Sequence, residues 1–442
     1  MNDLFEKAPI PKAYLQLALP VVLGMVASMI YNLADTFFVA QTGNADLVAG
    51  IALGSPLFSF MLAIGDIFGL GGSAVISRVL GKHDYQQSAR ISSFCFYAAI
   101  ALSLVLTVLL LVFEAPILNL LGATNATRPY IADFYRVLVL GSTFIIVSLV
   151  PGNIIRTEGL AQFSMIATVS GTILTIILDP LFLFGFHWGA SGVALANVIG
   201  FAVNTGLLVI FMRRAKSLSL APNQAHISRP TFKAVVAVGI PASLTNLTQS
   251  FGLMLLNSYL AAYGAQAVAA MGIVQKIYMV VMMVMIGFAF GAQPLIGYNY
   301  GAKNWSRLRA ILRFDLKIEV GYALVCALLL IIFAPQLITL FMAQPAIVAM
   351  GTVMLRAILI TTPLVGTILV FTTVFQSVGN GTSALIMALA RQAVLLGLAI
   401  VILAHFFGLT GIIWAQPVAD VLTCLIGGWL YRRAFRDVPL HA

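Results

Sequence analysis

Residues 13–40 read AYLQLALPVVLGMVASMIYNLADTFFVA, and Asp35 is the only charged residue among them. The segment is longer than the about 20 apolar residues that an α-helix needs to cross the hydrocarbon core of a membrane. Lipid offers the backbone no hydrogen-bonding partners, so a chain in lipid folds as a helix, whose backbone groups pair with one another. The segment therefore predicts a transmembrane helix.

Stretches of the same kind recur to the end of the chain. Of the 442 residues, 61% are hydrophobic and 9% are charged, whereas about 25% of the residues of a soluble domain are charged. We predict an all-α integral membrane protein with twelve transmembrane helices. The predicted spans are 13–40, 51–80, 92–113, 131–152, 160–186, 190–212, 235–262, 271–300, 317–340, 352–376, 384–407 and 411–432.

The net charge of +10 is unevenly distributed. With the N-terminus in the cytoplasm, most of the 24 Lys and Arg residues fall on cytoplasmic segments, and the outer loops hold only Arg128. Such a bias sets the orientation of a membrane protein, so both termini are predicted to be cytoplasmic and the location to be the cell inner (plasma) membrane. The basic clusters anchor the chain at the membrane surface, and we expect no nucleic-acid partner.

The chain repeats itself at an interval of about 220 residues. Ala18-Leu19-Pro20 matches Gly239-Ile240-Pro241, and Met212-Arg213-Arg214 matches Tyr431-Arg432-Arg433. Each half holds six predicted spans, so both halves enter the membrane from the same side and are related by a pseudo-twofold axis along the membrane normal. The predicted domains are a first lobe over 1–212, a cytoplasmic linker over 213–233 and a second lobe over 234–442.

Buried acids of the first half are the main candidates for function, because a charged side chain inside a membrane is costly. Asp35 lies about 7–8 Å from the outer end of its predicted helix, and Asp179 about 10 Å from the outer end of its own. Asn197 falls at the same depth, and Tyr31 and Thr175 lie one turn below the two acids. A side chain that reaches up to water from a helix end explains any one of these residues, but not their common depth.

We predict that these five residues form an ion-coupling site. Burial favours the protonated form of a carboxyl group, and a second carboxylate nearby favours it further, so Asp35 and Asp179 can bind and release protons. The same oxygens, with Asn197 and Thr175, can instead hold Na⁺. The second half has Leu256 where the first has Asp35, which places the ion chemistry in the first half.

Other polar residues inside the spans are weaker candidates. Asp66, Asn153 and Asn32 are candidate substrate contacts in the first half, and Asp66 alternatively pairs with a neighbouring helix. In the second half, Glu319 is interpreted as structural, and Arg391 as a member of a buried pair or an anchor. The candidate lining residues of the second half are Asn246, Gln249, Gln275, Met282 and Asp420.

Several classes of protein are excluded by motifs that the sequence lacks. It has no phosphate-binding loop for ATP, no nucleophile elbow and no metal-ligand spacing among its histidines and three cysteines. We therefore expect neither an enzyme nor a cofactor, and the only ion that we expect to be needed is H⁺ or Na⁺.

With these residues in view, the chain resembles the multidrug and toxic compound extrusion (MATE) family, and most closely its DinF-like branch. The resemblance rests on Pro20, on residues 32–39, on the stretch Gly72–Gly81, on residues 153–159 and on Leu178-Asp179-Pro180-Leu181-Phe182. It implies twelve helices in two lobes around a V-shaped central cleft. It also implies export of amphipathic, often cationic, drugs or toxins by proton or sodium antiport, and we expect a monomer in the lipid bilayer.

The resemblance also implies roles for single residues. In this branch the acids that match Asp35 and Asp179 are the proposed ion site, and the proline that matches Pro20 allows its helix to bend. The family often has Asn at the position of Thr175 and Thr at the position of Asn197, so this chain exchanges the two polar types. The alternatives are a Na⁺-coupled drug antiporter, a lipid-linked oligosaccharide flippase of related architecture, and a channel or receptor that does not transport.

Overall fold

The computed structural model describes residues 2–436, and within that range the chain is helical and has no strand. The first half holds α1 (Asn2–Glu6), α2 (Ile10–Gln41), α3 (Ala45–Gly81), α4 (Tyr85–Val112), α5 (Glu114–Leu120), α6 (Arg128–Leu140), α7 (Ser142–Ile154), the 3-10 turn η1 (Ile155–Glu158), α8 (Ala161–Pro180), the π-helix η2 (Leu181–Gly185) and α9 (Gly189–Met212). The 3-10 turn η3 (Pro222–Gln224) follows in the linker. The second half holds α10 (Arg229–Ala261), α11 (Ala265–Gly301), α12 (Trp305–Ile332), α13 (Ala334–Phe341), α14 (Pro345–Val378), α15 (Gly381–Leu389), the π-helix η4 (Ala390–Leu395) and α16 (Leu396–Ala434).

These helices account for the twelve predicted spans. By length and apolarity alone, eight helices of the described chain can cross a membrane, and up to ten can if each of two bent pairs is one span. The stretch Gly381–Ala434 counts there as one, but Gly408 breaks it with non-helical angles (φ 56°, ψ −133°). The 33-residue α10 is long enough to cross a membrane but is less apolar than most of the other long helices. With these two additions the described chain has twelve transmembrane helices, as predicted.

The chain forms two compact units, and each contains a piece of both halves of the sequence. The first unit contains residues 23–243, and the second contains residues 2–22 and the described residues from 244 onward. Two long helices are thereby divided: α2 after Val22 and α10 after Ser243. Each division comes two residues after a proline inside the helix, Pro20 or Pro241. A proline inside a helix removes one backbone hydrogen bond and favours a bend there.

The internal repeat is visible in the lengths of the helices. The 37-residue α3 is matched by the 37-residue α11, and the 28-residue α4 by the 28-residue α12. The residues that cap α4 and α12 also correspond, since the side chains of Asp84 and Asn304 each accept a hydrogen bond from a backbone N–H of the first turn. Positions 220 residues apart therefore lie at equivalent places in the two halves, which allows each half to serve as a comparison for the other.

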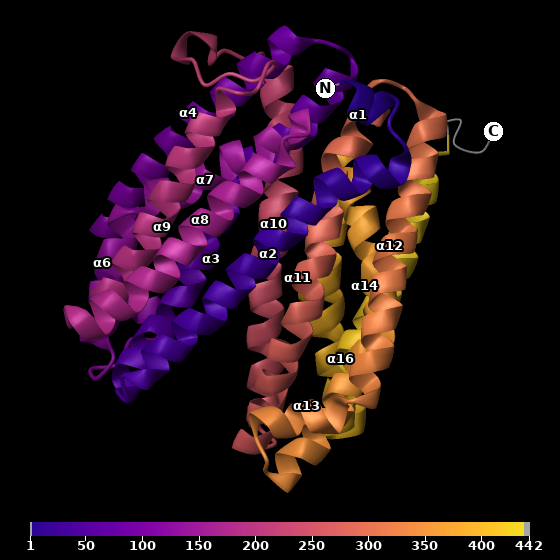
Figure 1. The fold of residues 1–442 in the computed structure, drawn as a ribbon. Coiled ribbons are helices and arrows are strands. Elements are labelled where there is room, and N and C mark those ends of the chain that lie inside the picture. Colours follow the sequence, from indigo (N-terminus) through magenta and orange to yellow (C-terminus); the bar gives the residue numbers. More distant parts are fainter. Residues whose placement is uncertain (1, 437–442) are drawn as a thin grey trace. The chain divides into compact units, whose positions relative to one another are not determined.

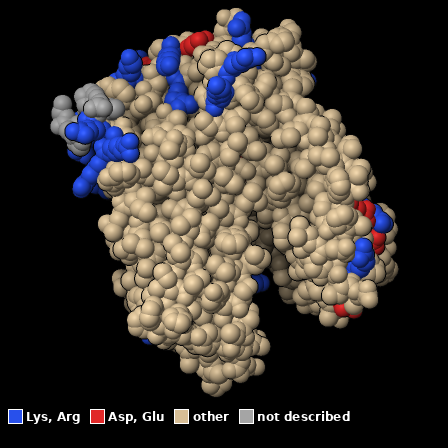
Figure 2. All heavy atoms as spheres, turned by 180° about the vertical axis from the view of Figure 1, so that it is seen from behind, with Lys and Arg blue, Asp and Glu red and all other residues tan. Residues whose placement is uncertain are grey.

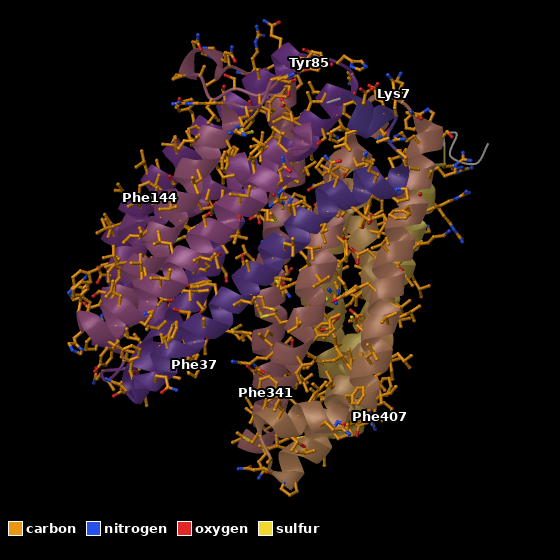
Figure 3. All side chains as sticks on the ribbon, viewed as in Figure 1. Lys7, Phe37, Tyr85, Phe144, Phe341 and Phe407 are labelled. Atoms are coloured by element: carbon orange, nitrogen blue, oxygen red, sulfur yellow. The ribbon has the colours of Figure 1, made fainter. Side chains whose placement is uncertain are left out.

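Both units bury apolar side chains between helices and expose others on the outside. In the first unit α3 packs against α7, and α9 packs against both α7 and α8; in the second, α14 contacts α11, α12 and α16 (Figure 1). Phe37 and Phe144 lie on the outside of α2 and α7, and Phe341 and Phe407 on the outside of α13 and α16 (Figure 3). Large apolar residues on the outer surface fit helices whose surroundings are lipid.

Charge is concentrated at one end of the second unit. Arg307, Arg309 and Arg313 lie in the first turns of α12, and Arg432 and Arg433 in the last turn of α16. Arg309 lies within electrostatic range of Tyr431, so these two helix ends are neighbours. Figure 2 shows basic side chains gathered at this end, above a side that is almost free of charge. This distribution agrees with a basic end that lies at the membrane surface.

Candidate ion-coupling site

The local structure around Asp179 follows from the proline after it. Pro180 has no N–H to donate to the helix, and α8 ends there and continues as the π-helix η2. Single π-helical turns inside a helix are frequently found at functional sites. The side chain of Asp179 is 1% exposed, and neither of its oxygens has a hydrogen-bond partner. A buried carboxyl group thus stands at the point where regular helix geometry stops.

The second acid comes from α2. Asp35 is half-buried, its Oδ1 has no hydrogen-bond partner, and its carboxyl group lies within hydrogen-bonding reach of that of Asp179. Two ionised carboxylates repel each other at such a separation, and the repulsion is strong where water is scarce. The pair is therefore most stable with one proton, or with a cation, between the two groups.

Polar side chains from α2 and α9 extend the pair into a network. The Tyr31 hydroxyl, one turn before Asp35, donates a hydrogen bond to Asn197 Oδ1, and Asn197 Nδ2 donates to the carbonyl of Val193 (3.0 Å). The Tyr31 ring also lies within electrostatic range of both acids. The structure thus brings Tyr31, Asp35, Asp179 and Asn197 into one group.

Thr175 reaches the same group through the contact between α8 and α9. Its hydroxyl donates to the carbonyl of Gly171 (3.0 Å) and lies 3.5 Å from the carbonyl of Ala196, the neighbour of Asn197. The helices approach closely because Gly200 faces Thr175. A Cβ atom at Gly200 would lie 2.0 Å from Thr175 Oγ1, so glycine is required at that position.

The predicted substrate contacts lie in a different arrangement. Asn153 is buried, and its Oδ1 accepts a hydrogen bond from Arg156 (3.2 Å), which also donates to Ser164 (3.2 Å). Asp66 is half-buried and within electrostatic range of the same Arg156. Asp66 and Asn153 therefore belong to a cluster around the half-buried Arg156, whereas Asn32 lies on an exposed face of α2.

The candidate lining residues of the second half are scattered. Asn246 and Gln275 are half-buried, Gln249 is exposed and Met282 is buried. Asp420 is fully buried: it forms an ion pair with Arg391 (2.9 Å) and accepts hydrogen bonds from Gln416 (3.0 Å) and Thr361 (3.1 Å). Arg391 is thus a member of a buried pair, and it lies in the π-helix η4.

Two further groups of acids are buried in the structure, and of these only Glu319 was interpreted from the sequence, as a structural residue. Glu158 is buried and accepts backbone hydrogen bonds from Lys216 (2.9 Å) and Ser217 (2.5 Å), which holds the end of η1 against the linker. Asp315 and Glu319 are both 0% exposed on α12. Their spacing of four residues, which places both on one face of a helix, is the sequence signal that identifies them.

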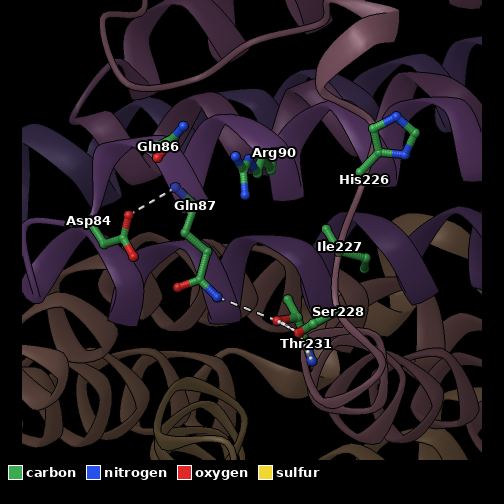
Figure 4. A pocket seen from close by; sticks show the side chains of 8 residues that line it. All are labelled: Asp84, Gln86, Gln87, Arg90, His226, Ile227, Ser228 and Thr231. Atoms are coloured by element: carbon green, nitrogen blue, oxygen red, sulfur yellow. Dashed lines mark hydrogen bonds between the residues drawn. The ribbon is translucent and has the colours of Figure 1, made fainter.

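The first unit also has a small polar pocket, of about 280 Å³, where the linker passes the start of α4 (Figure 4). Gln87 connects its two sides: its backbone N–H donates to Asp84 (3.0 Å) and its side chain donates to Thr231 (3.4 Å). The lining residues are Asp84, Gln86, Gln87, Arg90, His226, Ile227, Ser228 and Thr231. None of the predicted ion or substrate residues is among them.

A chain of twelve transmembrane helices with a group of acids buried among polar partners defines a multi-pass membrane transporter, and comparison with known proteins identifies its kind. The family model described as MatE matches the chain twice, at residues 20–181 and 241–408. The matches begin at Pro20 and Pro241, the two prolines at which the units divide. This chain belongs to the MATE family, whose members are transporters and not enzymes.

Relatives of known name and structure cover almost the whole chain. The multidrug export protein MepA of Staphylococcus haemolyticus is 31% identical over 96% of this chain and 93% of that protein, and MepA of Staphylococcus aureus is 31% identical over 98% and 96%. A multidrug resistance MATE family transporter of the MOP superfamily, solved in an outward-facing conformation, has a TM-score of 0.92 at 25% identity. A MOP superfamily transporter from Pyrococcus furiosus has a TM-score of 0.93 at 25% identity. Each structure covers 99% of this chain, and 98% of the solved chain is matched.

Proposed function

We propose that this protein is a secondary active multidrug exporter. It exchanges amphipathic, often cationic, compounds for protons by alternating access, as a monomer in the cell inner membrane with both termini in the cytoplasm. The names of the relatives support export of drugs, since MepA is a multidrug export protein. The basic ends of α12 and α16 support the orientation, because positively charged segments stay on the cytoplasmic side.

One observation supports protons as the coupling ion. Asp35 and Asp179 lie within reach of each other, and three of their four oxygens have no hydrogen-bond partner. Two buried carboxyl groups in this arrangement gain a proton when one is available and release it when water enters. The neighbours Tyr31 and Asn197 fix the geometry, as residues that orient an ion site do.

Helix α2 connects protonation of the acid pair to release of the bound compound. Protonation of the pair from outside removes the repulsion between Asp35 and Asp179, and α2 bends at Pro20, where the helix already lacks one hydrogen bond. The bound compound then leaves to the outside. When the site next opens inward, the protons enter the cytoplasm and the cycle starts again.

The energy available sets a limit on the stoichiometry. A pH difference of one unit supplies about 1.4 kcal/mol per proton, and a potential of about 100 mV supplies about 2.3 kcal/mol per net charge. Exchange of one proton for a monocation moves no net charge, so only the pH gradient drives it. The two acids allow two protons per cycle, and the potential then contributes as well.

Sodium is the second candidate. The carboxyl oxygens of Asp35 and Asp179, with the side-chain oxygens of Asn197 and Thr175, are the kind of ligands that a hard cation takes. The Thr175 hydroxyl donates its proton to Gly171, so its lone pairs remain open to a cation. A flippase for lipid-linked sugars needs a cationic site for the phosphates, and the first unit's acids disfavour it.

The experiment is an efflux panel in cells that lack their own drug pumps. Cells that express this protein are expected to accumulate less of several cationic dyes, and an uncoupler that collapses the proton gradient is expected to abolish the difference. Asp133→Asn, at an exposed acid of α6, serves as the matched control for Asp179→Asn. Equal dye accumulation with and without the protein, across the panel, contradicts the proposal.

A further inference from the structure

The second unit contains a buried acid group that the proposed cycle does not use. Asp315 and Glu319 lie one turn apart on α12, and both side chains are 0% exposed. The hydroxyl of Tyr14, from the first half of α2, donates a 2.7 Å hydrogen bond to Asp315 Oδ1. Asp315 Oδ2 and both oxygens of Glu319 have no hydrogen-bond partner. Two carboxyl groups and a phenol thus meet in one buried space.

No positive charge in the described part of the second unit balances these acids. From α2 the facing group is Tyr14, and from α12 itself it is Tyr322, one turn beyond Glu319. From α11 the backbone of Ala289 lies near Glu319 without a hydrogen bond to its side chain, and from α14 Gly366 packs against the backbone of Glu319. Lys317 lies between the acids in sequence, but it is exposed on another face of the helix.

The chemistry of two buried carboxyl groups without a positively charged partner favours a bound proton. An unpaired buried carboxylate is strongly unfavourable, and such a group takes up a proton and becomes neutral instead. Asp315 has the Tyr14 hydroxyl to stabilise a negative charge, because a hydrogen bond to a carboxylate favours the charged form. Near Glu319 there is only the backbone of Ala289, which does not form a hydrogen bond with it, and a negative Asp315 one turn away disfavours its ionisation further.

The equivalent place in the first unit shows that the fold itself does not need acids here. Residues at the equivalent positions are Val235 for Tyr14, Cys95 for Asp315 and Ala99 for Glu319. All three are 0% exposed. Equivalent buried positions therefore hold apolar side chains in the first unit and two acids and a tyrosine in the second. Burial of polar groups where apolar ones suffice indicates a role other than stability.

We propose that Tyr14, Asp315 and Glu319 form a second proton-binding site, in which Glu319 carries the proton and Asp315 accepts the hydrogen bond from Tyr14. Loss of the proton places two negative charges one turn apart in a buried space, which favours separation of α12 from the first half of α2. Tyr14 precedes Pro20 by less than two turns. The site therefore acts on the segment of α2 before the proline, whereas Asp35 lies on the segment after it. The proposal does not depend on the role of Asp35 and Asp179.

The test is infrared spectroscopy of the full-length protein in lipid nanodiscs over a range of pH, without substrate. Glu319→Gln is expected to remove the band of one protonated carboxyl group per chain, whereas Lys317→Gln, on the exposed face of the same helix, keeps it. Tyr14→Phe is expected to keep that band but to remove the band of the hydrogen-bonded phenol. An unchanged carboxyl band in Glu319→Gln overturns the proposal. Loss of the wild-type band on addition of NaCl also overturns it, because the site then binds a cation.

A second measurement protects the test against a variant that does not fold. Glu319→Ala copies the first half, where Ala99 packs at the same place, so it is expected to fold. The folded protein holds a proton that the unfolded chain releases at neutral pH, so wild-type stability falls as pH rises. The slope of melting temperature with pH is expected to be smaller in Glu319→Ala, because one bound proton is lost while any at Asp35 and Asp179 remains, and Lys317→Gln is expected to keep the wild-type slope. Equal slopes in wild type and Glu319→Ala contradict the proposal.

Discussion

Asp35 of α2 and Asp179 of α8, which are 144 positions apart in the sequence, have carboxyl groups within hydrogen-bonding reach of each other. Helix α9 completes the surroundings with Asn197, which accepts a hydrogen bond from Tyr31. Three helices of the first unit thus meet at one polar group inside an otherwise apolar bundle. Each contact of this group leads to a measurable expectation.

The hydrogen bond between Tyr31 and Asn197 is expected to stabilise the site. Tyr31→Phe and Asn197→Ala each remove it, and a neutral hydrogen bond contributes about 0.5–1.5 kcal/mol. In a double-mutant cycle by thermal unfolding, the pair is expected to show a coupling energy of about 1 kcal/mol. Tyr31→Phe is also expected to shift the pH dependence of efflux. Strictly additive effects of the two changes argue that the bond does not form.

The close contact of α8 with α9 makes Gly200 sensitive to substitution. In Gly200→Ala the new Cβ would lie 2.0 Å from Thr175 Oγ1, so the helices must move apart, at a cost of about 1–3 kcal/mol. Gly206→Ala is the matched control, because no atom lies within 4 Å of a Cβ there and alanine favours the helix by about 0.5–1 kcal/mol. In detergent, the melting temperature of Gly200→Ala is expected to be lower than that of wild type, and that of Gly206→Ala to be higher. A stable Gly200→Ala protein with normal efflux contradicts this packing.

Pro20 and Pro241 occupy equivalent places, but only the first lies on a helix with an acid of the ion pair. Pro20→Ala restores a helical hydrogen bond, and the protein is expected to be as stable as wild type or more so. Because α2 then resists bending, efflux is expected to fall several-fold. Pro241→Ala, measured in the same transport assay, is expected to have the smaller effect. If the two variants transport equally well, bending of α2 is not a step of the cycle.

Replacing either Arg391 or Asp420 alone is expected to destabilise the protein far more than replacing both together. Removal of one partner leaves a buried charge unpaired, which costs about 3–5 kcal/mol. Arg391→Met and Asp420→Asn are therefore expected to lower the melting temperature strongly, and the double variant to recover much of the loss. If the double variant is as unstable as the sum of the two single variants, the two side chains do not act as a pair.

Much of the fold could be predicted from the sequence, because the signals involved are local. Apolar runs gave twelve spans, the repeat gave two halves, and both agree with the family. Depth along each predicted helix placed Asp35, Asp179 and Asn197 at one level, and the structure brings them together. The division of the chain into two units just after Pro20 and Pro241 was not predicted. A proline indicates where a helix can bend, but not which helices pack against the segments on its two sides.

The acids of the second unit could not be recognised from apolarity. The span was predicted to begin at residue 317, which leaves out Asp315, whereas α12 begins at Trp305. Its first turns are polar but are covered by the N-terminal residues: Arg307 donates to the backbone carbonyls of Phe5 (2.6 Å) and Ala8 (2.6 Å). Glu319 was interpreted as structural because of Lys317. Long-range contacts, which hydropathy does not report, bury these residues.

We propose that protons bound at Asp35 and Asp179 drive export, and transport in proteoliposomes tests this most directly. A pH gradient and a sodium gradient are imposed separately on purified protein, and uptake of a cationic dye is followed for wild type, Asp35→Asn and Asp179→Asn. The pH gradient alone is expected to drive transport by wild type. The rate of each variant is expected to be lower by a factor of about ten or more, which corresponds to about 1.4 kcal/mol or more in activation free energy. Transport that follows the sodium gradient, or that persists at the wild-type rate in both variants, contradicts the claim.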